Sequence, residues 1–436
     1  MWIAADGTRR HDASRARSRT ATAAPMSSPG DVLREPTLRY AARSARLSGS
    51  IIDSSTSILA RHDHDIVRFA MGSPAPDAIP ARELAAIAAR ELAAPAAFDY
   101  AATEGDPGLR AALLEMLAAH GRAVDPDRVL ITAGGMQGLD LACKLFVEPD
   151  ALVVVEGPTY TNGTATIASY EGRCLEVPVD DDGMRIDALI AAVEASGRVP
   201  SLIYTIPSFQ NPSGTTLSRE RRIRLMELAA SWNAVVLEDD PYGLIRFSGE
   251  PLPTLVELAD RPDRVVRVET FSKVLAPGLR VGWIEADPGV VQLMVNARQA
   301  MDTCTNLPAQ RLVAEFLRGG HMESHLARLR RAYRERRDVM QDALAEAFGD
   351  ERCAWTSPDG GMFLWLTLPE EVDAERLFPE ALLDGVAFIP GAAFTVEGRF
   401  GNALRLCFAT NGPDRIHEGV RRLRHTVDRL YPGLLP

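Results

Sequence analysis

The most reactive residue of this sequence follows the apolar run 265–272. Lys273 stands directly after two hydroxyl residues, Thr270 and Ser272, and shortly before Arg280. The run itself is typical of a buried strand. A lysine at the end of such a strand, flanked by hydroxyl groups and followed by an arginine, indicates an anion site that also holds a reactive amine.

Two carboxylates end the preceding apolar run, 234–240. Asp239 and Asp240 are the last residues of this run, and Tyr242 follows them closely. Two carboxylates at the end of a buried strand are costly unless they are paired. We therefore expect a cation to face them.

Glycines follow the apolar run 128–134 and precede a helical pattern at 136–147. Gly134 and Gly135 allow a tight turn, and the N-terminus of the next helix offers free N–H groups to an anion. This signal is weak alone, because an ordinary strand–helix turn has the same composition. The turn dipeptides of 208–214 are equally open to interpretation as a plain loop.

Short apolar runs alternate with amphipathic stretches from residue 128 onward. The expected strands are 128–134, 151–158, 201–207, 234–240 and 265–272, and the expected helices are 136–147, 160–170 and 218–232. This alternation predicts a mainly parallel sheet that is covered on both faces. Ligands of such sheets bind beyond the carboxyl ends of the strands, where the polar residues described above stand.

The pattern changes after Pro308. A charged amphipathic helix is expected over 321–348, followed by strands at 360–368, 385–391 and 402–409. These elements predict a smaller α+β domain. The arginines of the long helix could suggest a nucleic-acid patch, but the Glu and Asp between them favour a solvated helix face.

Composition excludes several classes of protein. The chain has 436 residues and a formal net charge of −11, so it lacks the basic balance of a protein that binds nucleic acid or an anionic membrane. No apolar run reaches the about 18 residues that span a bilayer. The first 35 residues are rich in Arg, Ser, Ala and Thr, which predicts a disordered tail.

The cysteines and histidines give no metal motif. Five cysteines are scattered through apolar stretches without a CxxC spacing, so we expect buried free thiols and a cytoplasmic, reducing location. The stretch 61–65, Arg-His-Asp-His-Asp, is interpreted as a solvated turn. No metal site is predicted.

Seven stretches, in this order, resemble the fold-type-I pyridoxal-phosphate enzymes, and specifically the class I/II aminotransferases. The branch is that of the 2-aminoadipate and kynurenine aminotransferases, which also supplies the effector domain of MocR-type regulators. The resemblance runs from about Ile66 to Arg424. It is carried by YAATEGDPGLR (100–110), EGPTY (156–160), NPSG (211–214), EDDPY (238–242), TFSKVLAPGLRVGW (270–283), GGMFLWL (360–366) and NALRLCF (402–408).

The resemblance implies an α/β fold with a large domain built on a mainly parallel seven-stranded sheet and a smaller α+β domain. The implied boundaries are 1–35 for the tail, 36–79 for an N-terminal arm and part of the small domain, 80–319 for the large domain and 320–436 for the small domain. It also implies pyridoxal 5'-phosphate as the cofactor and a homodimer with shared active sites. No nucleic-acid or membrane partner is expected.

The resemblance further assigns roles at the cofactor ring. Lys273 would form the Schiff base with the cofactor aldehyde and would later move the substrate proton. Asp239 would pair with the pyridine nitrogen and keep it protonated. Tyr242 and Asn211 would bind the phenolic oxygen, and Tyr160 would stack on the ring.

The other implied roles concern the phosphate and the substrate. The phosphate would be held by Gly134, Gly135, Met136, Thr270, Ser272 and Arg280, with Tyr100 reaching in from a second subunit. The α-carboxylate of the substrate would be bound by Arg405 with bidentate geometry, next to Gly72 and Asn211.

Two departures from the family pattern stand out. Gly135 and Met136 occupy the place of a usual Ser-Gln pair, so two side-chain contacts to the phosphate are lost. Relatives that accept acidic side chains often carry an arginine near the N-terminus, where residues 48–57 place Asp53. This carboxylate predicts neutral or basic substrates, unless it merely caps a helix at 54–61.

The function implied is transfer of an α-amino group from an L-amino acid to a 2-oxo acid through pyridoxamine phosphate. The alternative is another reaction of the same cofactor on an amino acid: β- or γ-elimination or replacement, cyclisation or oxidation. The catalytic residues alone do not separate these reactions. A MocR-type regulator would need an N-terminal winged helix of 60–70 residues, and residues 1–65 show no helix-turn-helix pattern.

Overall fold

An eight-stranded sheet positions most of the candidate residues. The computed structural model describes residues 39–47, 49 and 64–436, and a compact unit begins at Ala42 and ends at Pro436. The strands in spatial order are β2 (Val129–Thr132), β9 (Gly282–Glu285), β8 (Val265–Thr270), β7 (Val235–Asp239), β6 (Leu202–Thr205), β3 (Leu152–Gly157), β4 (Arg173–Asp180) and β5 (Gly183–Met184). All pairs are parallel except those made by β9 and β5.

The predicted count of seven strands is wrong by one. The additional strand is β5, which has two residues and pairs antiparallel with the end of β4 through Val179 and Met184. A strand of this length leaves no apolar run in the sequence, so pattern alone does not reveal it. The mainly parallel character of the sheet is confirmed.

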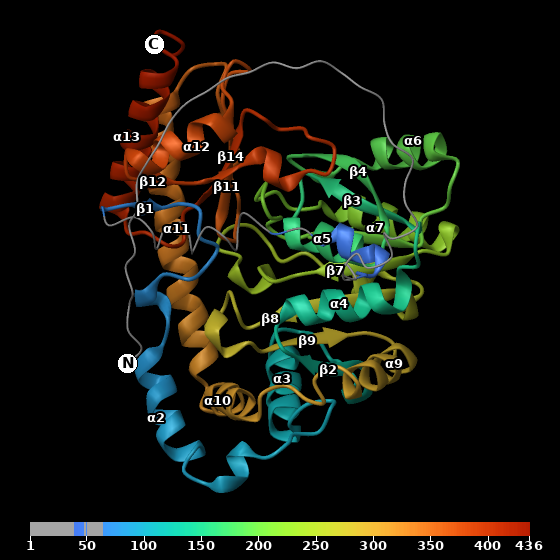
Figure 1. Ribbon diagram of the computed structural model, residues 1–436. Helices are drawn as coiled ribbons and strands as arrows, with labels where there is room; N and C mark the ends of the chain where they lie inside the picture. The colour runs from blue at the N-terminus through green and yellow to red at the C-terminus, as the bar shows by residue number, and fades with distance from the viewer. Residues whose placement is uncertain (1–38, 48, 50–63) are drawn as a thin grey trace, which may run out of the picture. The chain divides into compact units, whose positions relative to one another are not determined.

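Helices cover both faces of this sheet (Figure 1). One layer consists of α4 (Gly135–Phe146), α5 (Thr161–Ser169) and α9 (Pro288–Gln299), and the other of α6 (Ile186–Ser196), α7 (Arg219–Trp232) and α8 (Leu255–Leu258). Alternate strand residues pack into separate cores: Val236 faces one and Leu237 the other. This period of two is expected for a strand that is buried on both faces.

Close packing of α4 on the sheet depends on a glycine. A Cβ atom on Gly138 would stand 2.7 Å from Val268 Cγ1 of β8, so a larger residue would push the helix away. The N-terminus of α4 therefore lies directly over the carboxyl ends of the central strands.

Three further helices pack together. They are α2 (Ala81–Glu91), α3 (Pro107–Ala119) and α10 (Leu307–Arg318), with α10 in contact with both of the others. Asp106 caps α3 by accepting a hydrogen bond from Leu109 N–H at 2.9 Å, and Asn306 caps α10 in the same way through Ala309 N–H. Each cap is followed by proline within the first turn, which is typical of helix starts.

The last third of the chain forms a smaller sheet with its own helices. The four strands β10 (Ala354–Trp355), β11 (Phe363–Thr367), β14 (Ala403–Cys407) and β13 (Ile389–Pro390) are antiparallel in this order, and β12 (Val386–Ala387) pairs with β1 (Val67–Arg68). The helices are α11 (His321–Phe348), α12 (Ala374–Leu383) and α13 (Pro413–Leu430), and α11 packs along α13. The bounds of α11 match the predicted helix, and the pairing of β1 joins residues 67–68 to this part of the fold. The proposed domain boundaries stay a prediction.

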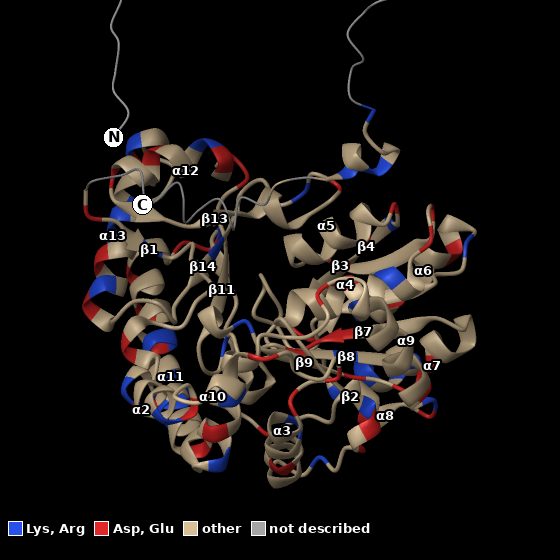
Figure 2. Cartoon of the chain, turned by 60° about the horizontal axis from the view of Figure 1, so that its bottom comes forward, with Lys and Arg blue, Asp and Glu red and all other residues tan. Residues whose placement is uncertain are grey.

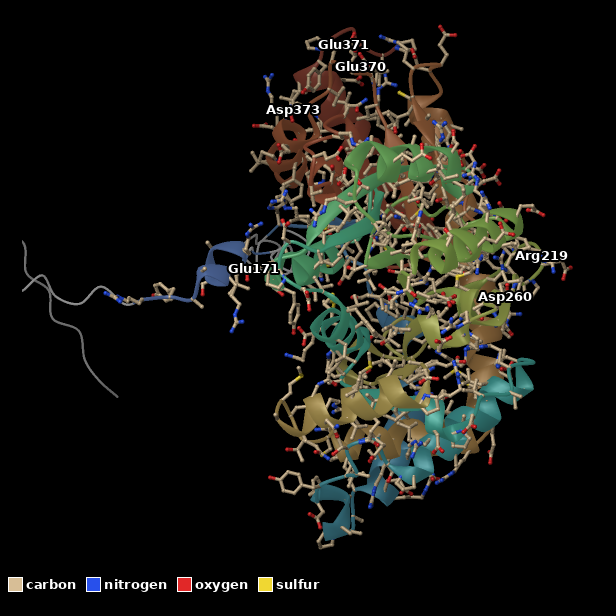
Figure 3. The ribbon with its side chains drawn as sticks, turned by 90° about the vertical axis from the view of Figure 1, so that its right-hand side faces the viewer. Glu171, Arg219, Asp260, Glu370, Glu371 and Asp373 are labelled. Atoms are coloured by element: carbon tan, nitrogen blue, oxygen red, sulfur yellow. The ribbon has the colours of Figure 1, made fainter. Side chains whose placement is uncertain are left out.

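Charged residues lie mostly on the helices, whereas β11 and β14 carry few (Figure 2). Arg219, Asp260 and Glu370 lie at the outer surface (Figure 3). No helix of the described part of the chain is both long and apolar enough to cross a bilayer. Within the same residues, no cluster of three His, Cys, Asp or Glu could hold a metal ion.

The five cysteines are all free thiols, as predicted, but only three are buried. Cys143, Cys353 and Cys407 lie in the core, whereas Cys174 and Cys304 are half-buried. The end of the predicted solvated turn at 61–65 can be described: Asp65 is exposed and forms ion pairs with arginines of α13. Residues 61–63, the predicted tail and Asp53 lie outside the described residues.

Candidate active site

A cavity of about 260 Å³ lies beyond the carboxyl ends of β6, β7 and β8. Its remaining walls come from the start of α4, from residues 70–73 and from the small sheet. The predicted site residues that line it are Gly72, Gly135, Met136, Tyr160, Asn211, Asp239, Tyr242, Thr270, Ser272, Lys273, Arg280 and Arg405. The fold therefore brings together in one place residues that are up to 333 positions apart in the sequence.

Two predicted residues do not line this cavity. Gly134 stands next to it, behind the side chain of Arg280. Tyr100 is 81% exposed, and no described part of this chain covers it. Its position does not complete the site of its own chain.

Lys273 presents its amine to the cavity. The turn after β8 is held by Ser272 N–H, which donates a hydrogen bond to Thr270 Oγ1 at 3.1 Å, and Lys273 Nζ donates to the carbonyl oxygen of Gly72 at 2.6 Å. Loss of water around the amine and the nearby positive charge of Arg405 lower the pKa of Lys273 to about 8. An amine that loses its proton close to neutral pH is a competent nucleophile.

Asp239 ends β7 and points into the same cavity. Its Oδ2 accepts a hydrogen bond from the buried Tyr204 hydroxyl at 2.9 Å. Burial raises the pKa of Asp239 to about 7, although the Tyr204 hydrogen bond and the charge of Lys273 oppose this shift. A buried carboxyl whose hydrogen-bond donor is a neutral phenol is suited to receive a cationic N–H group from a ligand.

The opposite end of the cavity is shaped for an anion. The N-terminus of α4 begins at Gly135, after Gly134 turns the chain with φ +83°. Arg280 has a left-handed conformation with φ +54°, and its guanidinium donates to the carbonyl oxygens of Ala133 and Pro277 at 3.3 and 3.2 Å. A Cβ on Gly134 would stand 2.6 Å from Arg280 Nη2, so a larger residue would displace this guanidinium, while the positive φ itself favours glycine.

Hydroxyl groups stand at the same end. Thr270 Oγ1 donates to Ser272 Oγ at 2.9 Å, and Arg280 Nη1 lies 3.5 Å from Ser272 Oγ. Met136 provides a thioether here rather than an amide, and its Sδ accepts a hydrogen bond from the Tyr160 hydroxyl at 3.6 Å. The side-chain donors at this end are therefore the two hydroxyls and the guanidinium.

Arg405 stands on β14 and is 1% exposed. Its Nη1 donates to Asn211 Oδ1 at 3.0 Å and its Nη2 to the Ala70 carbonyl oxygen at 2.7 Å, while the Phe363 ring lies 4.2 Å from the guanidinium carbon. Within the described residues, Arg405 Nε has no hydrogen-bond partner. Burial lowers the pKa of this arginine, and its charge is not neutralised by a carboxylate among the described residues. This is the electrostatic setting of an anion-binding guanidinium.

A buried network holds Asn211 in place. Gln210, its neighbour, donates from Nε2 to Glu156 Oε2 at 3.2 Å and to the Pro158 carbonyl oxygen at 2.6 Å, and its Oε1 accepts from Ser213 N–H. Burial raises the pKa of Glu156 to about 7. The loop after β6 is therefore tied to β3 by hydrogen bonds rather than left free.

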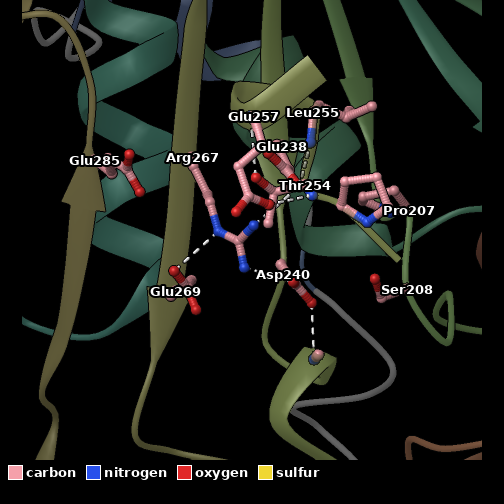
Figure 4. Close-up of polar contacts among 12 residues, drawn as sticks. Pro207, Ser208, Glu238, Asp240, Thr254, Leu255, Glu257, Arg267, Glu269 and Glu285 are labelled. Carbon is pink, nitrogen blue, oxygen red and sulfur yellow. Dashed lines mark hydrogen bonds and ion pairs between the residues drawn. The ribbon is translucent and has the colours of Figure 1, made fainter. Parts of the chain in front are cut away.

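The predicted cation for the two aspartates is found, but it pairs with Asp240. Arg267 of β8 donates to Asp240 Oδ2 at 2.7 Å, to Glu238 Oε1 at 3.2 Å and to Glu269 Oε1 at 2.9 Å (Figure 4). Asp239 contacts Tyr204 instead, because successive residues of β7 point to opposite faces of the sheet. A cation is therefore found for each carboxylate in a different form: Arg267 forms an ion pair with Asp240, whereas Lys273 acts on Asp239 electrostatically without an ion pair.

Sequence reasoning missed Tyr204, Glu156, Arg267 and Phe363 as members or supports of the site. Each lies inside a strand or a quoted motif. For Tyr204, Glu156 and Arg267 the signal was a polar or charged residue within an apolar run, whereas the apolar Phe363 gave no such signal. Tyr204 and Arg267 are completely or nearly completely buried, and such polar groups require partners.

The start of α4, Thr270, Ser272 and Arg280 form an anion cup at one end of the cavity. The fold and this cavity define an α/β enzyme with a reactive lysine, a buried carboxyl and this anion cup at the carboxyl ends of a mainly parallel sheet. Residues 65–423 match the family described as aminotransferase class I and II. This match covers more than half of the chain.

Individual relatives agree with this match. The chain is 38% identical over 369 residues to aromatic-amino-acid aminotransferase 1 of Thermococcus litoralis, covering 83% of this chain and 88% of the relative. It is 40% identical over 374 residues to 2-aminoadipate transaminase of Thermus thermophilus, covering 85% and 91%. Kynurenine aminotransferase of Pyrococcus horikoshii, solved in complex with PMP, superposes with a TM-score of 0.84 at 35% identity, covering 90% of this chain and 98% of that chain.

The chain belongs to the class I and II aminotransferases. It is a pyridoxal-phosphate-dependent transaminase of fold type I, as the sequence resemblance implied. The alternative of an elimination, cyclisation or oxidation is not favoured, since these relatives are aminotransferases by name.

The residues present fit the cofactor. The anion cup, with Thr270, Ser272 and Arg280, has the chemistry to hold a phosphate group. Among the described residues, the buried Asp239 carboxyl has no cationic partner at hydrogen-bond distance, and Lys273 offers an amine of lowered pKa. These three features suit the phosphate, the ring nitrogen and the aldehyde of pyridoxal 5'-phosphate.

Proposed function

We propose that this transaminase takes its amino group from an L-amino acid with a neutral side chain and passes it to a 2-oxo acid, using Lys273 as the base and Arg405 as the carboxylate anchor. The observation that carries this proposal is the set of charges around the cavity. In the described part of the chain, Lys273, Arg280 and Arg405 are the cations that line it and Asp239 is the anion.

Lys273 is proposed to bond to the cofactor aldehyde and to move the proton at the substrate Cα. Bound pyridoxal phosphate supplies an electron sink that stabilises negative charge at this carbon. Asp239 is proposed to keep a proton on the ring nitrogen. Tyr204 supports this role, because its hydrogen bond to Asp239 fixes the carboxyl in one orientation.

Tyr160, Asn211 and Tyr242 are proposed to orient the cofactor ring. Tyr160 is held near the cup by its contact with Met136, and Tyr242 packs edge-to-face on Phe363 at 5.9 Å. These contacts support fixed positions for the two tyrosine side chains, on opposite sides of the proposed cofactor ring.

Arg405 is proposed to bind the substrate α-carboxylate next to Gly72. A Cβ on Gly72 would stand 3.1 Å from Phe363 Cζ and 4.0 Å from Lys273 Nζ, so the glycine keeps the space between anchor and base open. A guanidinium that is already positioned by Asn211 and Ala70 loses little conformational freedom on binding.

The preference for a neutral side chain follows from the charges just described. Arg280 belongs to the proposed phosphate cup, Lys273 to the chemistry and Arg405 to the α-carboxylate. No further cation of the described residues lines the cavity for a second substrate carboxylate, whereas Met71, Met136 and Leu139 offer apolar contact. Burying an unpaired carboxylate is costly, so acidic side chains should be disfavoured.

A donor panel tests this proposal. The holoenzyme is assayed with phenylalanine, leucine, lysine, glutamate and 2-aminoadipate, with 2-oxoglutarate or pyruvate as acceptor, and the 2-oxo acid product is measured. We expect kcat/KM for the neutral donors to exceed that for 2-aminoadipate by about tenfold or more. A preference for 2-aminoadipate would contradict the side-chain assignment, and the absence of amino-group transfer with every donor would contradict the function itself.

We also propose a homodimer in which Tyr100 reaches the phosphate of the partner's cofactor. The exposure of Tyr100 and of nearby Phe98, 81% and 66%, supports a covered surface at this place. A mixture of two inactive variants tests it: hybrids of Tyr100→Ala and Lys273→Ala chains would contain one complete site. Recovery of activity on mixing is expected, and no recovery after verified subunit exchange would contradict the shared site.

The five free cysteines support a reducing compartment, and we propose the cytoplasm.

A further inference from the structure

A second and larger cavity, of about 890 Å³, lies on the other side of β7 and β8 from Lys273. Asp240, Arg267 and Glu269 line it, and these residues alternate along the strands with Asp239 and Thr270 of the first cavity. The two cavities share no lining residue. The larger one is therefore a separate feature of the fold.

Most charges on the floor of this cavity are offset within the chain, because Arg122, Arg267 and the buried Arg222 stand against Glu238, Asp240, Glu269 and Glu285. Arg267 pairs with Glu238, Asp240 and Glu269 (Figure 4), and Arg122 donates to Glu269 at 2.9 Å and also pairs with Glu285. Burial raises the pKa of Glu238, so this carboxyl contributes less negative charge than its type suggests. Such a network fixes the floor and leaves little charge for a ligand.

The rim differs from the floor because its cations lack carboxylate partners. Ala327, Arg330, Arg331 and Arg334 have the spacing of one helical face of α11, and all four line the cavity. Arg330 donates to the Leu244 carbonyl oxygen at 3.0 Å. No described carboxylate forms an ion pair with any of these three arginines, and blue segments mark their helix in Figure 2.

Arg246 stands on the other wall. It donates to the Ser248 carbonyl oxygen at 3.2 Å and stacks on the Phe209 ring, with the guanidinium carbon 4.7 Å from its centroid. Asp359 and Asp240 act on it electrostatically without forming an ion pair. Among the lining residues, Glu257 is the acid outside the floor network, and its carboxylate is engaged by Thr254 N–H at 2.7 Å.

Seven arginines line this cavity, and the four at its rim form no ion pair with a described carboxylate, which is unexpected in a chain of net charge −11. Arginines at i, i+3 and i, i+4 repel one another unless a counter-charge lies between them. Guanidinium groups bind phosphate and carboxylate oxygens in a bidentate manner, and the size of the cavity is within the range of small-ligand sites. Apolar walls from Leu117, Leu252 and Phe247 complete an environment for an organic anion.

We propose that this cavity binds a small multivalent oxyanion, a phosphorylated or polycarboxylate metabolite, through Arg246, Arg330, Arg331 and Arg334. The site is distinct from the cofactor cup and does not depend on the donor that the enzyme uses. It assigns a function to the arginine face of α11, which the sequence alone favours as a solvated surface.

Calorimetric titration of the holoenzyme tests the site. Pyrophosphate and citrate serve as probes at constant ionic strength. The holoenzyme is used because its cofactor already fills the phosphate cup. Arg334→Glu removes a rim cation. Arg328→Glu is the matched control, because Arg328 is an exposed arginine of the same helix that does not line the cavity. Thermal unfolding without added anion verifies that both variants are folded.

We expect saturable binding of at least one probe, with affinity reduced about tenfold or more in Arg334→Glu and nearly unchanged in Arg328→Glu. Arg334→Lys should restore part of the affinity, since it keeps the charge but not the bidentate geometry. Tighter binding of pyrophosphate would assign a phosphorylated ligand, and tighter binding of citrate a polycarboxylate. Binding of neither probe, or equal loss in the two Glu variants, would overturn the proposal.

Discussion

Asp239 and Asp240 are neighbours in the sequence, yet their surroundings differ. Asp240 is held by Arg267 in a network of buried ion pairs. Asp239 accepts a hydrogen bond from Tyr204, and its pKa is raised to about 7 by burial. One strand thus presents a paired carboxylate to one side of the sheet and an incompletely paired carboxyl to the other.

The difference separates groups that stabilise the protein from groups that await a ligand. In the Arg267 network, each arginine charge is met by carboxylates of the same chain. In the Lys273 cavity, Arg405 Nε has no described partner and Lys273 has a lowered pKa. Perturbed titratable groups in a cavity are typical of functional sites, whereas balanced ion pairs are typical of structural ones. Substitutions on the Lys273 side should therefore reduce activity, and substitutions in the Arg267 network should reduce stability.

The largest effect is expected for Lys273→Ala. Loss of the amine removes both the bond to the cofactor and the base, so the rate of amino-group transfer should fall by about 10⁴-fold or more. The measurement is a single-turnover reaction of amino acid with the cofactor-loaded enzyme. Lys144, exposed on α4, is the matched control, and Lys144→Ala should retain the wild-type rate. A wild-type rate of amino-group transfer in the Lys273→Ala variant would contradict the role of Lys273 as the base.

Asp239→Asn should reduce kcat by about 10³-fold while the cofactor remains bound. An amide cannot stabilise the protonated ring nitrogen, so the electron sink is weakened. Steady-state kinetics and cofactor absorbance measure the two quantities separately. The melting temperature should change little, because the charge of Asp239 is not part of an ion pair.

Asp240→Asn is the matched partner of that variant. It removes one side of a buried ion pair, so the free energy of unfolding should fall by about 3 kcal/mol, with a smaller effect on kcat than in Asp239→Asn. Denaturant unfolding gives this value. If Asp239→Asn were the less stable variant and Asp240→Asn the slower enzyme, the division between the two sides of the sheet would be wrong.

Arg405→Ala should mainly weaken amino-acid binding. Loss of a desolvated charge pair costs about 2–5 kcal/mol, which corresponds to a KM increase of about 30-fold or more. Arg405→Lys should recover only part of this, because an ammonium group lacks the planar bidentate geometry. An unchanged KM with a reduced kcat would place Arg405 in the chemistry rather than in binding.

The smallest expected effect is that of pH on cofactor capture by the apoenzyme. Only the neutral amine of Lys273 attacks an aldehyde. The lowered pKa of about 8 sets the fraction of Lys273 that is neutral at each pH. Stopped-flow mixing with pyridoxal phosphate should show a rate that rises roughly tenfold between pH 7 and pH 9 and then levels. A rate that still rises steeply above pH 9 would indicate a lysine of ordinary pKa.

Much of the fold follows from the sequence because parallel strands buried on both faces leave continuous apolar runs. The runs at 151–158 and 265–272 correspond to β3 and β8, and the helix at 321–348 matches α11. Strand β4 has a half-buried pattern without such a run, and β5 and β10 have two residues each, so they were missed. Short or half-exposed strands depend on pairing that the sequence pattern does not encode.

The site was predictable where residues follow strand ends, and unpredictable where contacts cross between strands. Lys273, Asp239 and Asn211 were identified by their motifs and meet in one cavity. The contacts of Tyr204 with Asp239 and of Arg267 with Asp240 depend on the register of neighbouring strands. Register is set by packing across the sheet, so single-sequence reasoning finds the polar residues but not their partners.

The central claim is that Lys273 bonds to the cofactor, and the composition of the chain makes its test direct. Of 48 basic residues only two are lysines, Lys144 and Lys273. Borohydride reduction of the holoenzyme, followed by proteolysis and mass spectrometry, should place the reduced phosphopyridoxyl group on the peptide that contains Lys273. A label on Lys144, or none on either lysine in a cofactor-loaded and active enzyme, would contradict the claim.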